Sequence, residues 1–309
     1  MPSIPQIQEL LARAGRSTVV EATEAIASHS GSGVMVVRSL GETYIAKVGS
    51  AAKLRAEVEK YRSWPATAGR GRRILAEIDL PGGEMAFLGE YLSGTPLAEL
   101  FRDAGRSPAR AARSLADALH RLWRATVTAA PAPLVYSRDI EDRLVPLLVH
   151  RPELAPILGE RLPRGGTGRQ LLDRLAAAEP ALRAPMTVHT HGDLTPDNVL
   201  FDEDTGAICF LDLARSGPGD PLLDVGKFVA ACVREELLGR ELPAATEACS
   251  LLCEAAGTFC ASCGDRRFAA RLAISTARTL LGSARLPPPR RAATQIRRGL
   301  SLLEDALGA

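Results

Sequence analysis

The sequence has no apolar run that approaches the length of a membrane span, and it has no surplus of charge. Its 38 lysine and arginine residues nearly balance its 36 acidic residues, which gives a formal net charge of +2. This balance supplies no general attraction to nucleic acid or to an anionic membrane. The first residues show neither a basic segment nor an apolar core, so we expect no signal peptide and a cytoplasmic protein.

Histidine is also scarce, and none of the five histidines lies beyond His191. His189, His191 and Asp193 have the spacing that opens a metallo-hydrolase signature, but Leu194 stands where that signature needs another histidine. Because no histidine follows, too few imidazoles remain for a two-zinc centre.

Six cysteines are present, and all of them lie from residue 209 onward. Cys249, Cys253, Cys260 and Cys263 have spacings that could hold a zinc ion. Free cysteine is also a common small apolar residue on packed helices. The sequence leaves both alternatives open.

The most informative stretch covers residues 189–201 and is followed by a second apolar run at 208–213. Two apolar runs around an acidic, glycine-containing turn predict a β-hairpin. Antiparallel pairing would bring Asp193 and Asn198, which precede the first strand, to the same end as Asp212, which lies in the second run. Two carboxylates and an amide provide the oxygen ligands that a hard divalent cation prefers.

The order His191-Gly192-Asp193, then Asn198, then Asp212 resembles the catalytic and metal loops of kinase-fold phosphotransferases. The HGD form and the continuation through Asp220 and Asp224 look like the aminoglycoside phosphotransferase family. In motif the sequence is most similar to the 3'-phosphotransferase group of that family. The chain, with 309 residues of which 46% are hydrophobic, is long enough for two lobes with their own cores.

The resemblance implies an α+β, bilobal protein-kinase-like fold. Its N-lobe, residues 1–92, would bind nucleotide and contain a five-stranded antiparallel sheet with one main helix. Its mainly helical C-lobe, residues 93–309, would carry the catalytic loop, the metal site and the substrate-binding helices. Periodicity predicts strands at 19–22, 34–38, 43–48, 74–80 and 85–91, and a helix at 51–64. It predicts later helices at 108–123, 136–148, 170–178, 222–238, 249–257, 267–281 and 294–307, with a break at 286–291.

In the N-lobe, the resemblance implies that Lys47 binds the nucleotide phosphates and that Glu57, with Glu59 as the alternate, holds Lys47. Small residues before the second strand would let backbone N–H groups approach the phosphates. Backbone groups of a hinge segment would bind the base. The residues of these two segments are Ser30, Gly31, Ser32 and Gly33, and Glu90, Tyr91 and Leu92.

In the C-lobe, the resemblance makes Asp193 the residue that orients the acceptor hydroxyl and accepts its proton. Asn198 and Asp212 would hold Mg²⁺ between the phosphates of ATP or GTP. Three further residues would support the loop structurally: His191, Asp220 and Asp224.

The short segment between Asp212 and Asp220 leaves no room for the peptide platform of a protein kinase, so a small-molecule acceptor is favoured. A polycationic aminoglycoside would need acidic side chains. Candidate substrate contacts are Arg215, Asp139, Asp142 and Glu235, but many arginines lie in the same regions.

We therefore expect an O-phosphotransferase acting on an aminoglycoside or another hydroxylated antibiotic or natural product, in resistance or self-protection. A metabolic kinase for a sugar, nucleoside or amino alcohol, or a catalytically silent nucleotide-binding protein, is the alternative. We expect a monomer or homodimer that has no nucleic-acid or membrane partner.

Overall fold

The computed structural model describes residues 1–26, 32–103, 108–132, 136–237, 239, 244–285 and 287–308. The chain forms two compact units. Unit 1 comprises Met1–Thr95 and Leu200–Ser216, and unit 2 comprises Pro96–Val199 and Gly217–Ala309. The boundary predicted from the sequence lay after residue 92, and the segment that contains Asp212 groups here with the first part of the chain.

Unit 1 is built on a five-stranded antiparallel sheet, as the sequence predicts. Its strands, in spatial order, are β1 (Ala22–Ile26), β2 (Gly33–Ser39), β3 (Glu42–Ser50), β6 (Glu84–Glu90) and β5 (Ile74–Leu80). The weakly patterned first strand was predicted at 19–22 but lies three residues later. All five of its residues are exposed, so no buried face marks its position in the sequence.

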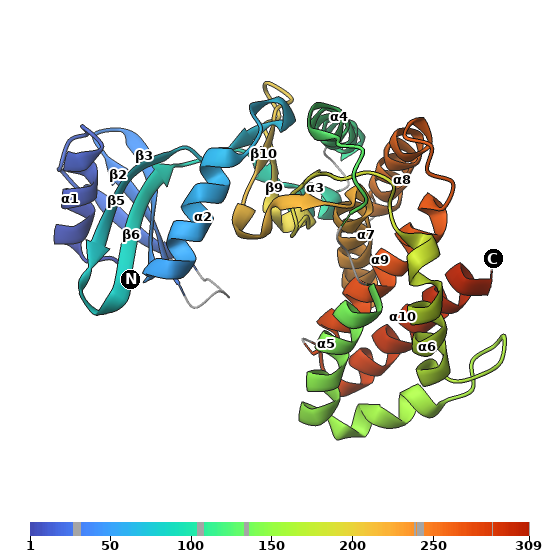
Figure 1. Cartoon of the computed structure of the whole chain (residues 1–309). Helices are drawn as coiled ribbons and strands as arrows, with labels where there is room; N and C mark the ends of the chain where they lie inside the picture. The colour runs from blue at the N-terminus through green and yellow to red at the C-terminus, as the bar shows by residue number, and fades with distance from the viewer. Residues whose placement is uncertain are drawn as a thin grey trace. The chain divides into compact units, whose positions relative to one another are not determined.

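Each face of this sheet packs on one helix (Figure 1). Helix α1 (Ile4–Arg13) packs with Ile7, Leu10 and Leu11 against alternate residues of β3, β5 and β6. Helix α2 (Ala51–Ser63) packs with Leu54 and Val58 against the other face. Because side chains alternate between the faces of a strand, Lys47 lies on the α2 face, opposite Ala46 and Val48.

The predicted hairpin is present as β9 (Val199–Phe201) and β10 (Ile208–Phe210), which are neighbours in a second sheet. That sheet has the order β4 (Arg70–Gly71), β10, β9, β7 (Thr95–Pro96). The Asp202 N–H donates to the Ala207 carbonyl in the connecting turn, at 2.9 Å. Trp64, just after α2, packs on Phe210 with ring centroids 5.2 Å apart, which fixes β10 against the end of α2.

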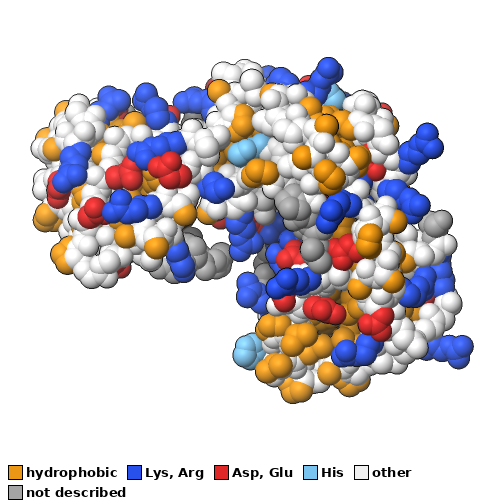
Figure 2. All heavy atoms as spheres, in the orientation of Figure 1, with side chains coloured by type: hydrophobic (Ala, Val, Ile, Leu, Met, Phe, Trp, Pro, Cys, Tyr) orange, Lys and Arg blue, Asp and Glu red, His pale blue; other side chains and the backbone are white. Residues whose placement is uncertain are grey.

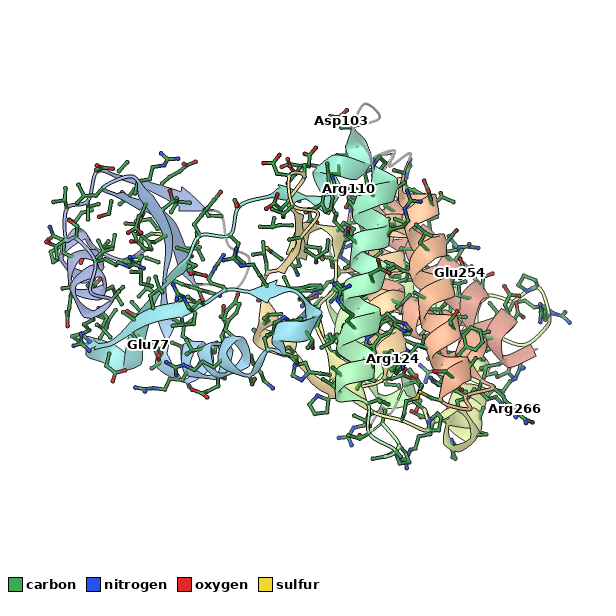
Figure 3. All side chains as sticks on the ribbon, turned by 90° about the horizontal axis from the view of Figure 1, so that it is seen from above. Glu77, Asp103, Arg110, Arg124, Glu254 and Arg266 are labelled. Carbon is green, nitrogen blue, oxygen red and sulfur yellow. The ribbon has the colours of Figure 1, made fainter. Side chains whose placement is uncertain are left out.

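Unit 2 is mainly helical, as predicted. Its helices are α3 (Leu97–Arg102), α4 (Pro108–Thr126), α5 (Tyr136–His150), α6 (Gly168–Ala178), α7 (Pro221–Leu237), α8 (Ala245–Ser262), α9 (Phe268–Ser283) and α10 (Pro289–Gly308). One apolar core joins α5, α6, α9 and α10 with the 3₁₀ segment Pro152–Gly159. In Figure 3, α4, which carries Arg110 and Arg124, runs beside α8, which carries Glu254. There Trp123 and His120 pack on Phe259.

The helices α8 and α10 extend furthest beyond their predicted bounds. Helix α8 extends to Ser262 instead of residue 257, because Gly257 is tolerated inside the helix where it packs against Phe268. Helix α10 starts at Pro289, inside the predicted break, because proline is compatible with the first turn of a helix. Within the part of the chain that the structure describes, no helix combines the length and apolarity needed to cross a membrane.

Close packing of α7 on α9 depends on Gly226. A Cβ at this position would lie 2.5 Å from Ser275 Oγ and 2.8 Å from the Thr276 backbone nitrogen. We expect Gly226→Ala to lower the free energy of unfolding by about 1–3 kcal/mol, because the backbone atom cannot move aside without a helix shift.

Gly282→Ala is the matched control for this prediction. It also adds a methyl group inside a helix, but its nearest neighbour at 2.6 Å is the flexible Arg143 side chain. The control should therefore be neutral or stabilising, since alanine favours helix. Urea unfolding of both variants tests the comparison, and equal stability of the two would contradict it.

Candidate active site

Lys47 and Glu57 form an ion pair inside unit 1. The Lys47 Nζ lies 2.8 Å from Glu57 Oε1 and 2.7 Å from Oε2. The two side chains are only 12% and 8% exposed. Glu59, the alternate partner, is exposed and pairs instead with Arg62. Helical spacing explains the difference, since Glu57 shares the buried face of α2 with Leu54 and Val58.

Replacing Glu57 tests how much this pair stabilises unit 1. Glu57→Gln leaves a poorly solvated ammonium without its counter-charge, so we expect faster amide hydrogen exchange in β3 and α2. The expected loss of local stability is about 1–3 kcal/mol. Glu59→Gln, which alters only an exposed pair, should change exchange little. Equal exchange in both variants would show that the buried pair does not stabilise the unit.

Asp212 belongs to the same unit and has a left-handed backbone conformation, with φ 52° and ψ 57°. This conformation is strained for a residue other than glycine and persists only where surrounding contacts hold it. Tyr61, on the last turn of α2, is buried and hydrogen-bonds to the Asp212 backbone. Burial, with smaller contributions from the charges of Glu57 and Asp212, raises the pKa of Tyr61 to about 12, and the charge of Arg72 acts in the opposite direction. Within unit 1, Lys47 thus contacts Glu57 in the middle of α2, and Asp212 contacts Tyr61 on its last turn.

The predicted catalytic loop lies in unit 2. It follows β8 (Val188–Thr190), which pairs with β11 (Gly217–Gly219) directly before α7. The Asp193 N–H donates to His191 Nδ1 at 3.2 Å. The Asp193 carbonyl accepts from Asn198 Nδ2 at 2.9 Å. This bond commits the nitrogen of the Asn198 amide and leaves its oxygen as the atom suited to a cation.

Asp224, on the first turn of α7, clamps the backbone of this loop. Its carboxylate accepts from the His191 N–H at 2.7 Å and from the Gly192 N–H at 2.8 Å. Asp224 and His191 are both fully buried. Burial raises the pKa of Asp224 to about 7, while the two backbone donors and Lys227 act in the opposite direction. The pairing of β8 with β11 explains how residues 33 positions apart come together.

Asp220 makes a different contact from Asp224. Its Oδ1 accepts from the Leu222 N–H at 3.0 Å, which caps α7. Its Oδ2 accepts from Tyr136 Oη and from Arg271 Nε, both at 2.8 Å. Arg271 also lies 2.7 Å from Asp265, and this whole network is buried. Asp220 therefore joins the start of α7 to α5 and α9.

Lys227 lies at the site although it belongs to none of the sequence motifs. Its ammonium forms an ion pair with Asp193 Oδ1, and each side chain is 19% exposed. Lys227 lies beyond the motif, within the mostly apolar sequence Leu222 to Cys232. A single lysine in an otherwise mostly apolar helical pattern, three residues after Asp224, was the available signal.

The remaining nucleotide candidates are arranged as follows. The Glu90 N–H already donates to the Arg73 carbonyl at 3.0 Å, so a base would have to be bound by other groups of the segment. Tyr91 is exposed and Leu92 is buried. Gly33 opens β2, and Ser32 packs beside Gly49. Ser30 and Gly31 lie outside the described residues.

The proposed substrate carboxylates have basic partners. Asp139 pairs with Arg278 on α9. Glu235 lies 3.8 Å from Arg102 and 3.9 Å from Arg234. Asp142 is exposed, with Arg138 at 3.9 Å. Arg215 ends the 3₁₀ turn Leu213–Arg215 of unit 1 and is exposed.

The cysteines are all free, and Cys249, Cys253 and Cys260 lie on α8 with Cys263 directly after it. Among the described residues, no group of three or more histidine, cysteine, aspartate or glutamate side chains could hold a metal ion.

A sheet that carries a buried lysine–glutamate pair, with a helical unit that carries the clamped Asp193 loop, defines a kinase-like phosphotransferase fold. The sequence model of the phosphotransferase enzyme family matches residues 34–248. The chain therefore belongs to this family, as the resemblance in the motifs indicated. A comparison with curated proteins gives no match.

Several solved structures share the fold over nearly their whole length. One is a thermostable mutant of aminoglycoside phosphotransferase APH(4)-Ia in ternary complex with ADP and hygromycin B (16% identity, 98% and 97% of the two chains, TM-score 0.60). Another is an aminoglycoside 2'-phosphotransferase IIIa mutant with GDP (15%, 98% and 97%, TM-score 0.61). A third is a Haemophilus somnus protein whose name suggests a fructosamine-3-kinase (13%, 96% and 96%, TM-score 0.64). Identities this low establish the fold alone.

Proposed function

We propose that this protein transfers the γ-phosphate of ATP or GTP to a hydroxyl of an aminoglycoside or another hydroxylated antibiotic or natural product, in resistance or self-protection. The observation that supports this most strongly is the Lys47–Glu57 pair, in which both carboxylate oxygens contact one buried ammonium. An ammonium that a carboxylate holds in one orientation is suited to bind a phosphate. Structures similar to this chain contain ADP or GDP, the products that remain after transfer from ATP or GTP, so we propose either triphosphate as the donor.

The proposed reaction is an in-line displacement at phosphorus. Asp193 accepts the proton of the acceptor hydroxyl, whose oxygen forms a bond to the γ-phosphorus. The bond from this phosphorus to the bridging oxygen breaks, and its electron pair leaves with the nucleoside diphosphate. The buried Asp224 clamp and the Asn198 bond fix the backbone on both sides of Asp193, so little reorganisation is needed during transfer.

We propose that the Asn198 amide oxygen and the Asp212 carboxylate hold Mg²⁺. Both are hard oxygen donors, and Mg²⁺ in phosphotransferases typically uses one or two protein groups together with phosphates and water. The absence of a three-residue metal cluster among the described residues fits such a site better than an all-protein cage. When bound, the ion would neutralise charge on the phosphates.

The charges around the candidate substrate residues of unit 2 indicate which kind of acceptor to test. An arginine lies beside each of the three candidate carboxylates, Asp139, Asp142 and Glu235. The arginines offset part of the negative charge that would attract a polycationic acceptor. On the face shown in Figure 2, acidic and basic side chains are interspersed over unit 2. This observation favours testing neutral acceptors beside aminoglycosides. A metabolic kinase for a sugar, nucleoside or amino alcohol is the second candidate, and the similarity to the Haemophilus somnus protein supports including it.

Nucleotide turnover with Mg²⁺ against a panel of acceptors tests the proposal. The panel contains aminoglycosides, other hydroxylated antibiotics, nucleosides, sugars and amino alcohols, each with ATP and with GTP. Acceptor-dependent turnover and a product heavier by one phosphate are expected for an antibiotic. Turnover confined to sugars, nucleosides or amino alcohols would support the metabolic kinase. Tight nucleotide binding without turnover or hydrolysis would support a silent nucleotide-binding protein.

A further inference from the structure

Helix α7 presents two charged residues of opposite sign to the loop that contains Asp193. Asp224 and Lys227 are three residues apart and so share one face of the helix. Asp224 binds the backbone N–H groups of His191 and Gly192, whereas Lys227 binds the Asp193 carboxylate. One helix face therefore fixes both the backbone of the loop and the side chain that the proposed reaction uses.

The position of α7 is itself fixed, so Lys227 is delivered by a rigid element. Phe228, next to Lys227, is fully buried and packs edge-on against Phe101 of α3, with ring centroids 6.1 Å apart. Gly226, on its other side, lies against α9. Asp220 caps the start of the helix and is tied to Arg271. A lysine on such an element holds its partner more closely than one on a loop would.

Lys227 lies beside two acidic side chains that repel each other. Asp193 and Asp224 are two carboxylates that interact, since the charge of Asp193 raises the pKa of Asp224 while Lys227 lowers it. Lys227 is the cation that acts on both. With each side chain of the ion pair only 19% exposed, solvent screens the pair incompletely.

We propose that Lys227 is a positioning residue of the phosphoryl transfer, whose ammonium holds the Asp193 carboxylate in the orientation that accepts the hydroxyl proton. This inference rests on the proposed function of Asp193 and adds to it a residue outside the family's motif. A lysine that only stabilised the fold would affect the melting temperature and nucleotide binding as much as turnover.

Lys227→Met and Lys227→Arg separate these possibilities. Lys227→Met should lower kcat by about 10- to 100-fold, the effect expected when a reacting group is displaced slightly. The KM for nucleotide and the melting temperature should stay close to those of the wild type. Lys227→Arg should recover much of the lost kcat, because it keeps the charge. Lys53→Met, an exposed lysine on α2, is the control for loss of a positive charge.

A double variant adds a further criterion. In the Asp193→Ala background, Lys227→Met should cause no additional loss, because the lysine acts through that carboxylate. An unchanged kcat in Lys227→Met, or a loss that is independent of Asp193, would overturn the inference. Lack of turnover in the wild-type protein would instead count against the proposed function.

Side-chain ammonium ¹⁵N NMR tests the contact without turnover. The chain has only four lysines, so the Lys227 resonance can be assigned from its loss in Lys227→Arg. Asp193→Asn should shift this resonance, whereas Asp197→Asn, at an exposed neighbour in the same loop, should not. A Lys227 resonance that is insensitive to Asp193→Asn would overturn the inference even if no acceptor is found.

Discussion

Asp193→Ala should reduce phosphoryl transfer by about 10²- to 10⁴-fold, the range associated with loss of a positioned general base. The Asp193 carboxylate forms an ion pair with Lys227 of α7, and both side chains are 19% exposed. The backbone contacts with His191 and Asn198 do not involve the carboxylate. Affinity for Mg·nucleotide, measured by titration with a fluorescent analogue, should therefore stay within a few-fold of the wild type.

Asp197→Ala is the control for Asp193→Ala. Asp197 lies in the same loop, in the 3₁₀ turn Pro196–Asn198, and its side chain is exposed. We expect this variant to retain transfer. If Asp193→Ala turned over at the wild-type rate, another group would have to accept the hydroxyl proton. If it lost nucleotide binding together with transfer, its role would be in binding and not in proton transfer.

Arg271→Met should produce the largest loss of stability, about 3–5 kcal/mol, because it leaves buried carboxylates without their counter-charge. Arg271 is fully buried between Asp220 and Asp265, with its nitrogens 2.8 Å and 2.7 Å from their oxygens. Methionine fills much of the volume but supplies no charge or donor. The N-terminal cap of α7 would also be weakened, because the capping residue Asp220 would lose its contact with Arg271.

The measurement can be confined to unit 2. The chain has two tryptophans, Trp64 in unit 1 and Trp123 in α4 of unit 2. In a Trp64→Phe background, urea unfolding followed by fluorescence reports on Trp123. Arg297→Met is the control, because Arg297 pairs with Glu160 at an exposed site where such pairs contribute about 0–1 kcal/mol. Equal effects of the two substitutions would show that the buried network is dispensable.

Most of the fold could be predicted from local patterns of apolar residues in the sequence. Alternating apolar residues predicted β2, β3, β5 and β6, and helical periodicity predicted α2 and the main helices of unit 2. These patterns are readable because each element buries one face against a core. The exposed strand β1 and the start of α10 at Pro289 were misplaced because neither has a marked apolar boundary.

The site was predictable where its residues share a short motif or a helix face. The spacing of His191, Asp193 and Asn198 placed them in one loop. The resemblance to the family favoured Glu57 over Glu59 as the partner of Lys47, and Glu57 is the residue that contacts Lys47. Arginines near the substrate candidates were visible in the sequence, but the pairing of Asp139 with Arg278 and of Glu235 with Arg102 was not, because these partners are distant in the chain.

The sequence by itself determined the family, the order of strands and helices, and the loop that contains Asp193, because these depend on local spacing. Tertiary structure alone decided which distant charges meet. The pairing of β8 with β11 brings α7 to the loop, so Asp224 clamps its backbone and Lys227 contacts Asp193. Packing of α9 likewise places Arg271 beside Asp220. Such contacts join residues some 30 to 50 positions apart, and burial makes them strong, but no periodicity in the sequence encodes them.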